Sequence, residues 1–202
     1  QADPQPVSQT TVIPLLFLNG VPFRDFGERH EMLRLLIEEV KQRVDEGRGV
    51  LEKGAPRIYC GLPIAVDPGI IRMIEGTGLA IPVCCSLWLT PWQRISSPFK
   101  EFGDRIGVGI YTSISHSCEA HIATNLEYCK AFNVDGVVLL YPFSCRPWAI
   151  TPLMSKKRIQ EELGIPVLVL EADAYDTRAY SVGQLGTRIE TFAEVLRAAK
   201  MG

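Results

Sequence analysis

The sequence predicts an α/β protein with a Rossmann-like, doubly wound parallel sheet of about four strands in the order 2-1-3-4. Short apolar segments alternate with amphipathic segments along most of the 202 residues. Glycine or proline stands at many of the boundaries between them, where chain direction changes. The clearest strand, 136–141, is a continuous apolar run, as expected for a strand covered by helices on both faces.

The first 24 residues are predicted to form an N-terminal tail and linker that precede the α/β domain of residues 25–202. Residues 1–11 are polar and contain two prolines, and residues 12–18 read as an apolar extended stretch before the turn pair Asn19-Gly20. A helix is predicted over 25–46, because its apolar residues recur mostly at spacings of three and four. The chain lacks a starting methionine, so we expect it to be a piece of a longer protein.

The remaining elements follow from the same alternation of apolar runs, periodic segments and turn residues. Pro68 suits the first turn of a helix, Pro82 places its strand at an edge, and Ser117 suits a helix N-cap. In order, we predict strand 57–61, helix 68–75, strand 79–84, a short helix 98–105, helix 117–132, strand 136–141, helix 152–163, strand 165–170, an acidic loop 171–178 and helix 182–200.

Composition excludes several classes of function. Apolar residues make up 47% and charged residues 22% of the chain, which is ordinary for a globular protein. A net charge of −2 gives no sign of the positive charge with which proteins bind nucleic acid or an anionic membrane. The chain has neither an apolar run long enough to cross a bilayer nor a signal-peptide pattern at its start. We therefore expect a cytoplasmic protein whose six cysteines are reduced thiols.

Three of the cysteines fall where parallel sheets carry their chemistry, in the loops after the carboxyl ends of strands. Cys145 follows the clearest strand by four residues, and Cys85 comes at the end of the second strand. Cys118 stands beside the helix cap Ser117, where the helix dipole favours a thiolate. Cys145 is therefore the first candidate for a metal ligand, with Cys118 and Cys85 as further candidates.

Two of the other cysteines are predicted to be core residues. Cys60 lies within a strand and Cys129 within a helix, where a reduced thiol packs as a small apolar side chain. Cys84 and Cys85 are adjacent in a strand, so one of them should face the core and the other the opposite side.

Two weaker patterns leave alternatives open. Cys118-x-x-His121 has a helical spacing that suits a zinc clip, but such pairs are common by chance. Arg178 and Arg188 suit either a substrate contact or a surface ion-pair network with the acidic loop residues Asp173 and Asp176. Neither phosphate-binding motif, GxGxxG after a strand or GxxxxGK[ST], is present, and no Ser-His-Asp arrangement is favoured.

From about Glu31 to the C-terminus, an ordered set of short motifs resembles the 2-hydroxyacyl-CoA dehydratase and benzoyl-CoA reductase family, in particular the C-terminal part of its D component. The segment around Cys145, Phe-Ser-Cys-Arg-Pro, is one of them. The set comprises segments 57–63, 135–138, 143–147, 161–168 and 184–192, with the acidic residues Glu171, Asp173 and Asp176 before the last.

The resemblance implies an iron–sulfur enzyme that acts on an acyl-CoA substrate. It implies a [4Fe–4S] or double-cubane cluster with Cys145 as one ligand, and Cys118 and Cys85 as further ligands in the double-cubane case. It further implies that an ATP-hydrolysing activator protein supplies a low-potential electron, and that a second subunit of the family or a second copy completes the assembly. The reaction that the resemblance implies is radical dehydration or ATP-dependent reduction of the acyl-CoA.

The chain departs from the family in one respect, since it is about half the usual length and lacks the part that brings the other cluster ligands. One ligand does not hold a cubane, so we expect this chain alone to be inactive. Two alternatives remain open at this point: a double-cubane reductase of small molecules, and a cluster-free structural or docking domain.

Overall fold

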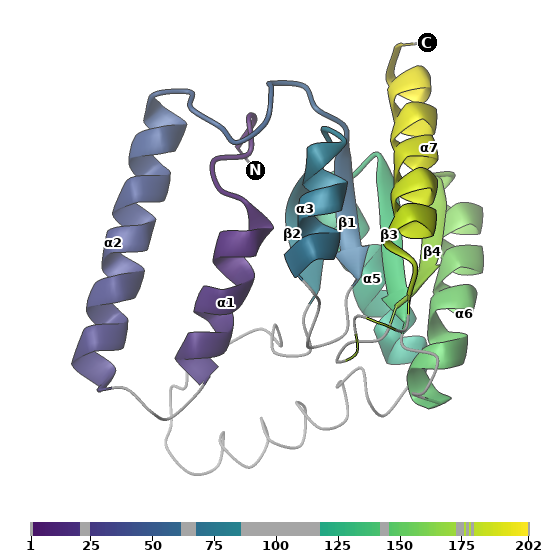
Figure 1. Cartoon of the computed structure of the whole chain (residues 1–202), viewed down its shortest axis with the longest axis horizontal. Helices are drawn as coiled ribbons and strands as arrows, with labels where there is room; N and C mark the ends of the chain where they lie inside the picture. The colour runs from purple at the N-terminus through teal and green to yellow at the C-terminus, as the bar shows by residue number, and fades with distance from the viewer. Residues whose placement is uncertain are drawn as a thin grey trace.

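The computed structural model describes residues 2–20, 25–61, 68–85, 118–141, 146–172, 176, 178 and 180–201. These residues form an α/β domain in which the alternation predicted from the sequence is confirmed (Figure 1). The elements are α1 (Gln9–Gly20), α2 (Phe26–Asp45), β1 (Arg57–Gly61), α3 (Pro68–Gly76), β2 (Ala80–Cys85), α5 (Cys118–Phe132), β3 (Gly136–Tyr141), α6 (Arg146–Leu163), β4 (Val167–Glu171) and α7 (Val182–Met201).

The four strands form one parallel sheet in the predicted order β2-β1-β3-β4. In Figure 1, α3 and α7 lie on one face of this sheet, and α5 and α6 lie on the other. Because the strands are parallel, their carboxyl ends all meet at one edge, the lower edge in Figure 1. Residues from distant parts of the sequence are thereby brought to a common edge.

The strands alternate their side chains between two apolar cores. On β1, Ile58 and Cys60 pack with residues of α3 and α7, whereas Tyr59 packs with residues of α5. The side chains of β3 alternate in the same way, with Val138 in the first core and Val137 in the second. Both faces of these strands are buried, which is why their sequences are continuously apolar.

Two sequence predictions about helices were wrong. The extended stretch predicted for residues 12–18 lies within the helix α1, whose first turn is held by Glu75 of α3 through the backbone N–H of Gln9 (3.0 Å). The helix predicted to begin at Pro152 begins at Arg146, and Pro152 lies inside it. An apolar run without clear periodicity fits either a strand or a helix, and a proline does not always mark a helix start. The short helix predicted over 98–105 lies outside the described residues.

An N-terminal segment that contains Gln5 and Gln9 covers the edge strand β2, and we call it the N-terminal strap. The backbone N–H of Ile81 donates to Gln5 Oε1 at 2.6 Å, and the Ile81 carbonyl accepts from Gln9 Nε2 at 2.8 Å. Both glutamines are buried, at 7% exposure each. They supply the hydrogen bonds that a neighbouring strand would otherwise make, and so close this edge of the sheet.

Replacing Gln5 by alanine should lower the free energy of unfolding by about 1–3 kcal/mol, because it leaves the buried Ile81 N–H without that acceptor. Urea unfolding followed by circular dichroism measures this change. The control is Gln42→Ala on α2, where the lost amide bonds only the exposed Glu46, and a change below about 0.5 kcal/mol is expected. Equal effects of the two substitutions would contradict the prediction.

Within the described part of the chain, none of the helices combines the length and apolar character needed to cross a membrane. The helix α2 stands beside α1, farther from the sheet (Figure 1), and its polar side carries the ion pairs Arg34–Glu31, Arg34–Glu38 and Arg43–Glu39.

Candidate functional site

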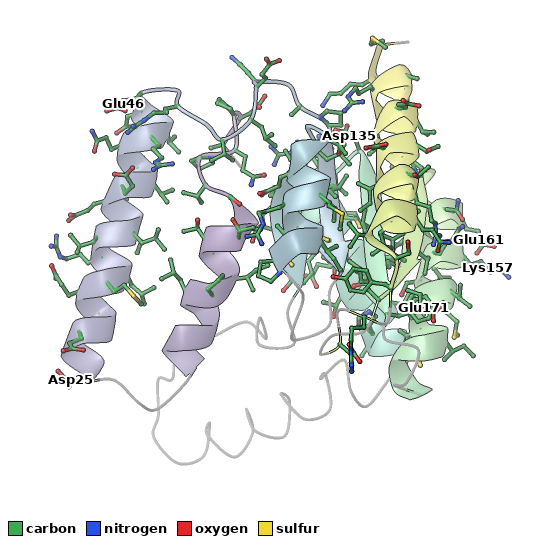
Figure 2. All side chains as sticks on the ribbon, in the orientation of Figure 1. Asp25, Glu46, Asp135, Lys157, Glu161 and Glu171 are labelled. Atoms are coloured by element: carbon green, nitrogen blue, oxygen red, sulfur yellow. The ribbon has the colours of Figure 1, made fainter. Side chains whose placement is uncertain are left out.

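The carboxyl edge of the sheet gathers the residues that the strand-end rule selects. The strands end there at Gly61, Cys85, Tyr141 and Glu171, and the helices α5 and α7 begin at the same edge (Figure 1). Asp135 lies at the opposite edge of the sheet. In Figure 2 its label stands well above that of Glu171. The α5 and α7 helices and the strand ends therefore define the candidate site.

Asp135 ties elements together at the amino edge. Its carboxylate accepts the Arg57 N–H at 2.7 Å and pairs with Lys200 Nζ at 3.0 Å, so that β1, β3 and α7 are joined. A structural role at this position follows from those contacts.

The prediction that Cys60 and Cys129 are core residues is confirmed, since both are buried. Cys84, one of the adjacent pair for which the sequence left the choice open, is buried as well. The thiol of Cys60 and burial together raise the pKa of Cys84 well above its ordinary value. Burial raises the pKa of Cys129 to about 12. The thiols of Cys84 and Cys129 therefore stay protonated near neutral pH, which does not suit a metal ligand or a nucleophile.

Of the three candidate ligands, Cys118 is the one whose side chain the structure describes. It is the first residue of α5, is partly exposed, and its Sγ shares a hydrogen bond of 3.2 Å with Thr151 Oγ1 of α6. Cys85 is the last residue of β2, where it is the register partner of Gly61. Cys145 lies outside the described residues. The structure thus brings Cys118 and the Cys85 backbone to the same edge.

A polar seam that sequence reasoning missed runs inward from Cys118 between α5 and α6. It comprises Cys118, His121 and Asn125 of α5 and Thr151 and Ser155 of α6. Asn125 Oδ1 accepts from Tyr59 Oη at 2.6 Å, and Asn125 Nδ2 donates to Ser155 Oγ at 3.1 Å. Spacings of three or four residues on each helix are the only sequence signal for this seam.

The zinc clip Cys118-x-x-His121, left open by the sequence, finds no further ligands in the described part of the chain. Among the described residues, no group of three or more histidine, cysteine or acidic side chains is placed to hold a metal ion. His121 is 3% exposed, and burial lowers the pKa of its imidazole from 6.5 to about 4. The imidazole of His121 in the seam is therefore uncharged near neutral pH.

The buried His121 predicts a pH dependence of stability. The unfolded chain takes up a proton near pH 6.5, whereas the folded protein does so only near pH 4, so stability is lost as the pH falls through this window. The expected loss by pH 4 is about 3 kcal/mol for this group. Urea unfolding between pH 4 and 7.5 measures it. His121→Leu should flatten the pH dependence in this window, and an unchanged slope in that variant would contradict the prediction.

A second feature of the carboxyl edge is a cavity at the end of β4, which we call the β4 pocket. Its volume is about 290 Å³. Glu171, at the end of β4, is labelled in Figure 2. The residues that line the pocket are Glu171, Tyr180, Ser181, Gln184, Leu185 and Arg188.

The charged side chains of the β4 pocket are each held by a neighbour. Glu171 Oε2 accepts from Tyr141 Oη at 3.1 Å, and Arg188 Nη2 donates to the Val169 carbonyl at 2.7 Å. Burial and the Glu171 carboxylate raise the pKa of Tyr141 above its ordinary value, so its hydroxyl remains a donor.

The two arginines named from the sequence have different roles. Arg178 pairs with Asp176 at 2.8 Å on the surface, in agreement with the ion-pair interpretation. Arg188 instead donates to a backbone carbonyl and lines the β4 pocket. Asp173 lies outside the described residues. The substrate-contact interpretation of Arg188 is therefore compatible with its position in the β4 pocket.

Comparisons with known proteins point to one family. The model of the 2-hydroxyglutaryl-CoA dehydratase D-component matches residues 1–196. The α subunit of (R)-2-hydroxyglutaryl-CoA dehydratase from Acidaminococcus fermentans is 25% identical over 174 residues, which cover 85% of this chain and 35% of the relative. The putative dehydratase subunit YjiM of Escherichia coli is 26% identical over 211 residues, covering 97% of this chain and 51% of the relative.

A third relative, the α subunit of (R)-phenyllactyl-CoA dehydratase from Clostridium sporogenes, is 33% identical over 86 residues, which cover 43% of this chain and 21% of the relative. The chain spans about half the length of the E. coli relative that it matches, and about a third of the A. fermentans relative.

Proposed function

The chain belongs to the family of 2-hydroxyglutaryl-CoA dehydratase D-components, and from this premise we propose that it is part of an enzyme that dehydrates a 2-hydroxyacyl-CoA. The family match over residues 1–196 is the observation that carries the proposal. Two relatives named as α subunits of acyl-CoA dehydratases support it. The proposed reaction removes the 2-hydroxyl group and a neighbouring proton as water, by a radical route.

The proposed cofactor is an iron–sulfur cluster that, when bound, would supply a single low-potential electron to the thioester. We propose Cys145 as one ligand, with Cys118 and Cys85 as further candidates. A partly exposed thiol at the carboxyl edge, as Cys118 has, suits a cluster ligand, whereas the buried thiols elsewhere do not. A cubane needs about four ligands, so the described residues alone do not complete its site.

The rest of the site would come from outside this chain. The short coverage of these two relatives supports the proposal that the chain corresponds to part of a longer enzyme. We propose that residues 25–202 are the C-terminal domain of that enzyme. The proposed partners are a second subunit of the same family, or a second copy, and an ATP-hydrolysing activator protein. Two relatives that are named as subunits of dehydratases support the first of these partners. We place the assembly in the cytoplasm, where thiols stay reduced.

Anaerobic reconstitution with iron and sulfide tests the proposal, carried out on the complete protein with its partner subunit. We expect cluster absorbance and an electron paramagnetic resonance signal in the wild type and their loss in Cys145→Ala. The matched control is Cys129→Ala, which removes a buried thiol and should keep the cluster. Loss of the cluster should also abolish dehydration of a 2-hydroxyacyl-CoA in the presence of the activator.

Four outcomes would contradict the proposal or one of its parts. A cluster that survives in Cys145→Ala removes that ligand, and zinc without iron in metal analysis indicates a zinc site instead. A cluster that reduces small molecules without dehydrating a hydroxyacyl-CoA favours a reductase of the double-cubane type. A wild-type protein without any cluster leaves a structural or docking domain.

A further inference from the structure

The helix α2 carries an apolar stripe that the described part of the domain leaves uncovered. The stripe consists of Leu33, Ile37, Val40 and Val44, at spacings of four, three and four residues. Ile37 and Val44 are 52% and 45% exposed, and none of the α2 side chains that the structure describes is buried. Each of the other described helices has at least one buried residue. The apolar side of α2 is therefore available to a partner.

Beside this stripe lies a cavity of about 500 Å³, which we call the α2 groove. Val40 and Val44 of the stripe line it, together with the N-terminal strap, α1, the start of β2 and the end of α5. The groove lies where β1 and β2 begin, at the opposite edge of the sheet from the candidate site. Its apolar lining residues from the other segments include Val7, Val12, Ala80, Ile81, Pro82 and Phe132.

The polar side chains that line the α2 groove already have partners. The amides of Gln5 and Gln9 are bound to the backbone of β2. The guanidinium of Arg57 donates to the carbonyls of Ala2 and Phe132, at 3.5 Å each. The groove therefore presents mainly apolar surface, which suits the apolar side of a helix better than a polar small molecule.

Within the described part of the chain, the helix whose apolar stripe is free to enter such a groove is α2 itself. A groove and the helix that fits it form a self-complementary surface, which two copies related by a two-fold axis use twice. The helices α1 and α2 run antiparallel (Figure 1), and Figure 2 labels Asp25 and Glu46 at the two ends of α2. Two such helical hairpins can pack together as a four-helix bundle.

The charges beside the stripe do not oppose this pairing. On one flank Arg34 pairs with Glu31 and Glu38, and on the other Arg43 pairs with Glu39. Because these charges are balanced within each helix, two copies of α2 do not meet as surfaces of one sign.

The contact area is sufficient for a specific pair. The helix α2 has 20 residues, so it is about 30 Å long and, with its side chains, about 10 Å wide. Its footprint is therefore about 300 Å², and since each copy both inserts one helix and receives another, about 600 Å² per copy is covered. This area lies at the lower end of the range for stable protein pairs.

We propose that two copies of this chain associate through the α2 groove, with the apolar stripe of α2 from each copy lying in the groove of the other. Removal of the stripe and the groove lining from water drives the association. The interface lies away from the carboxyl edge of the sheet, so the candidate site of each copy stays open to its own ligands.

Sedimentation velocity of the complete protein at about 1–100 µM, without partner subunit or activator, tests the association. The wild type should sediment with twice the mass of one chain at the upper concentrations. Ile37→Lys should raise the Kd of the pair at least about 10-fold, because it places a charge in the apolar groove of each copy. Val44→Lys, on the same stripe, should have the same effect.

The matched control is Leu35→Lys. Leu35 is 52% exposed, as Ile37 is, and lies on the same helix, but its spacing places it on the opposite side from the stripe. The Kd should therefore stay at the wild-type value. All three positions are exposed, so the variants should keep the wild-type circular dichroism and urea unfolding curve.

A monomeric wild type overturns the inference, and so does a pair that persists in both Ile37→Lys and Val44→Lys or weakens equally in Leu35→Lys. A wild type that is monomeric alone but binds a different subunit, with that binding lost in Ile37→Lys, assigns the groove to that subunit and overturns the association of two copies. Self-association is measured without cluster, activator or substrate, so its failure is distinct from a failure of the proposed function.

Discussion

Replacing Asn125 by alanine is expected to lower the free energy of unfolding by about 3–5 kcal/mol. Asn125 is completely buried at 0% exposure, and its amide joins three elements of the fold. It accepts from Tyr59 Oη of β1 and donates to Ser155 Oγ of α6. Alanine removes both hydrogen bonds and leaves a cavity, and two buried polar groups lose the bond that Asn125 gave them.

Urea unfolding followed by circular dichroism and by tyrosine fluorescence measures this loss. Thr124→Ala is the matched control, because the neighbouring Thr124 hydroxyl bonds only the carbonyl of Ala120 in its own helix. A change below about 0.5 kcal/mol is expected there. In a double-mutant cycle, Tyr59→Phe should cost clearly less in the Asn125→Ala background than in the wild type. Additive effects would show that the seam does not act as a unit.

Replacing Gly136 by valine is expected to cost at least about 3 kcal/mol. Gly136 begins β3 directly under α7, and a Cβ atom there would lie 2.8 Å from Leu196 Cδ2 and 3.1 Å from Phe192 Cζ. Both neighbours are buried, so neither can turn toward solvent without opening the core. Valine adds two further carbon atoms, which requires α7 to move away from the sheet.

Thermal unfolding measures the effect of Gly136→Val as a lowered Tm. Gly186→Ala is the control, because a Cβ atom at Gly186 meets nothing within 4 Å and the residue lies inside α7. Alanine favours the helix there and should stabilise the protein by about 0.5–1 kcal/mol. A tolerated Gly136→Val would contradict the close packing of α7 on β3.

Much of the fold could be predicted because each strand carries its own signal. Burial on both faces makes β1 and β3 continuously apolar, and the parallel order follows from the helices between them. The α1 helix was mispredicted because what holds its first turn is Glu75, a residue more than 60 positions away. Long-range contacts of this kind leave no local pattern in the sequence.

For the same reason, the cysteines of the candidate site could be sorted from the sequence, whereas the seam and the β4 pocket could not be predicted from it. Position within an element separated the core thiols Cys60 and Cys129 from Cys118 at a helix start. The seam was missed because Thr151 and Cys118 meet only through the packing of α5 on α6. The β4 pocket likewise needs the position of α7, although the strand-end rule had already selected Glu171.

The N-terminal strap has a consequence for association between molecules. Gln5 and Gln9 occupy the free backbone groups of Ile81 on one outer strand, and Arg188 occupies the Val169 carbonyl on the other. A sheet whose margins already hold side-chain partners offers little template for a strand from another chain. Assembly with a partner through this domain would then proceed by contacts between helices and loops, and recruitment of a further strand beside β2 would require the strap to detach first.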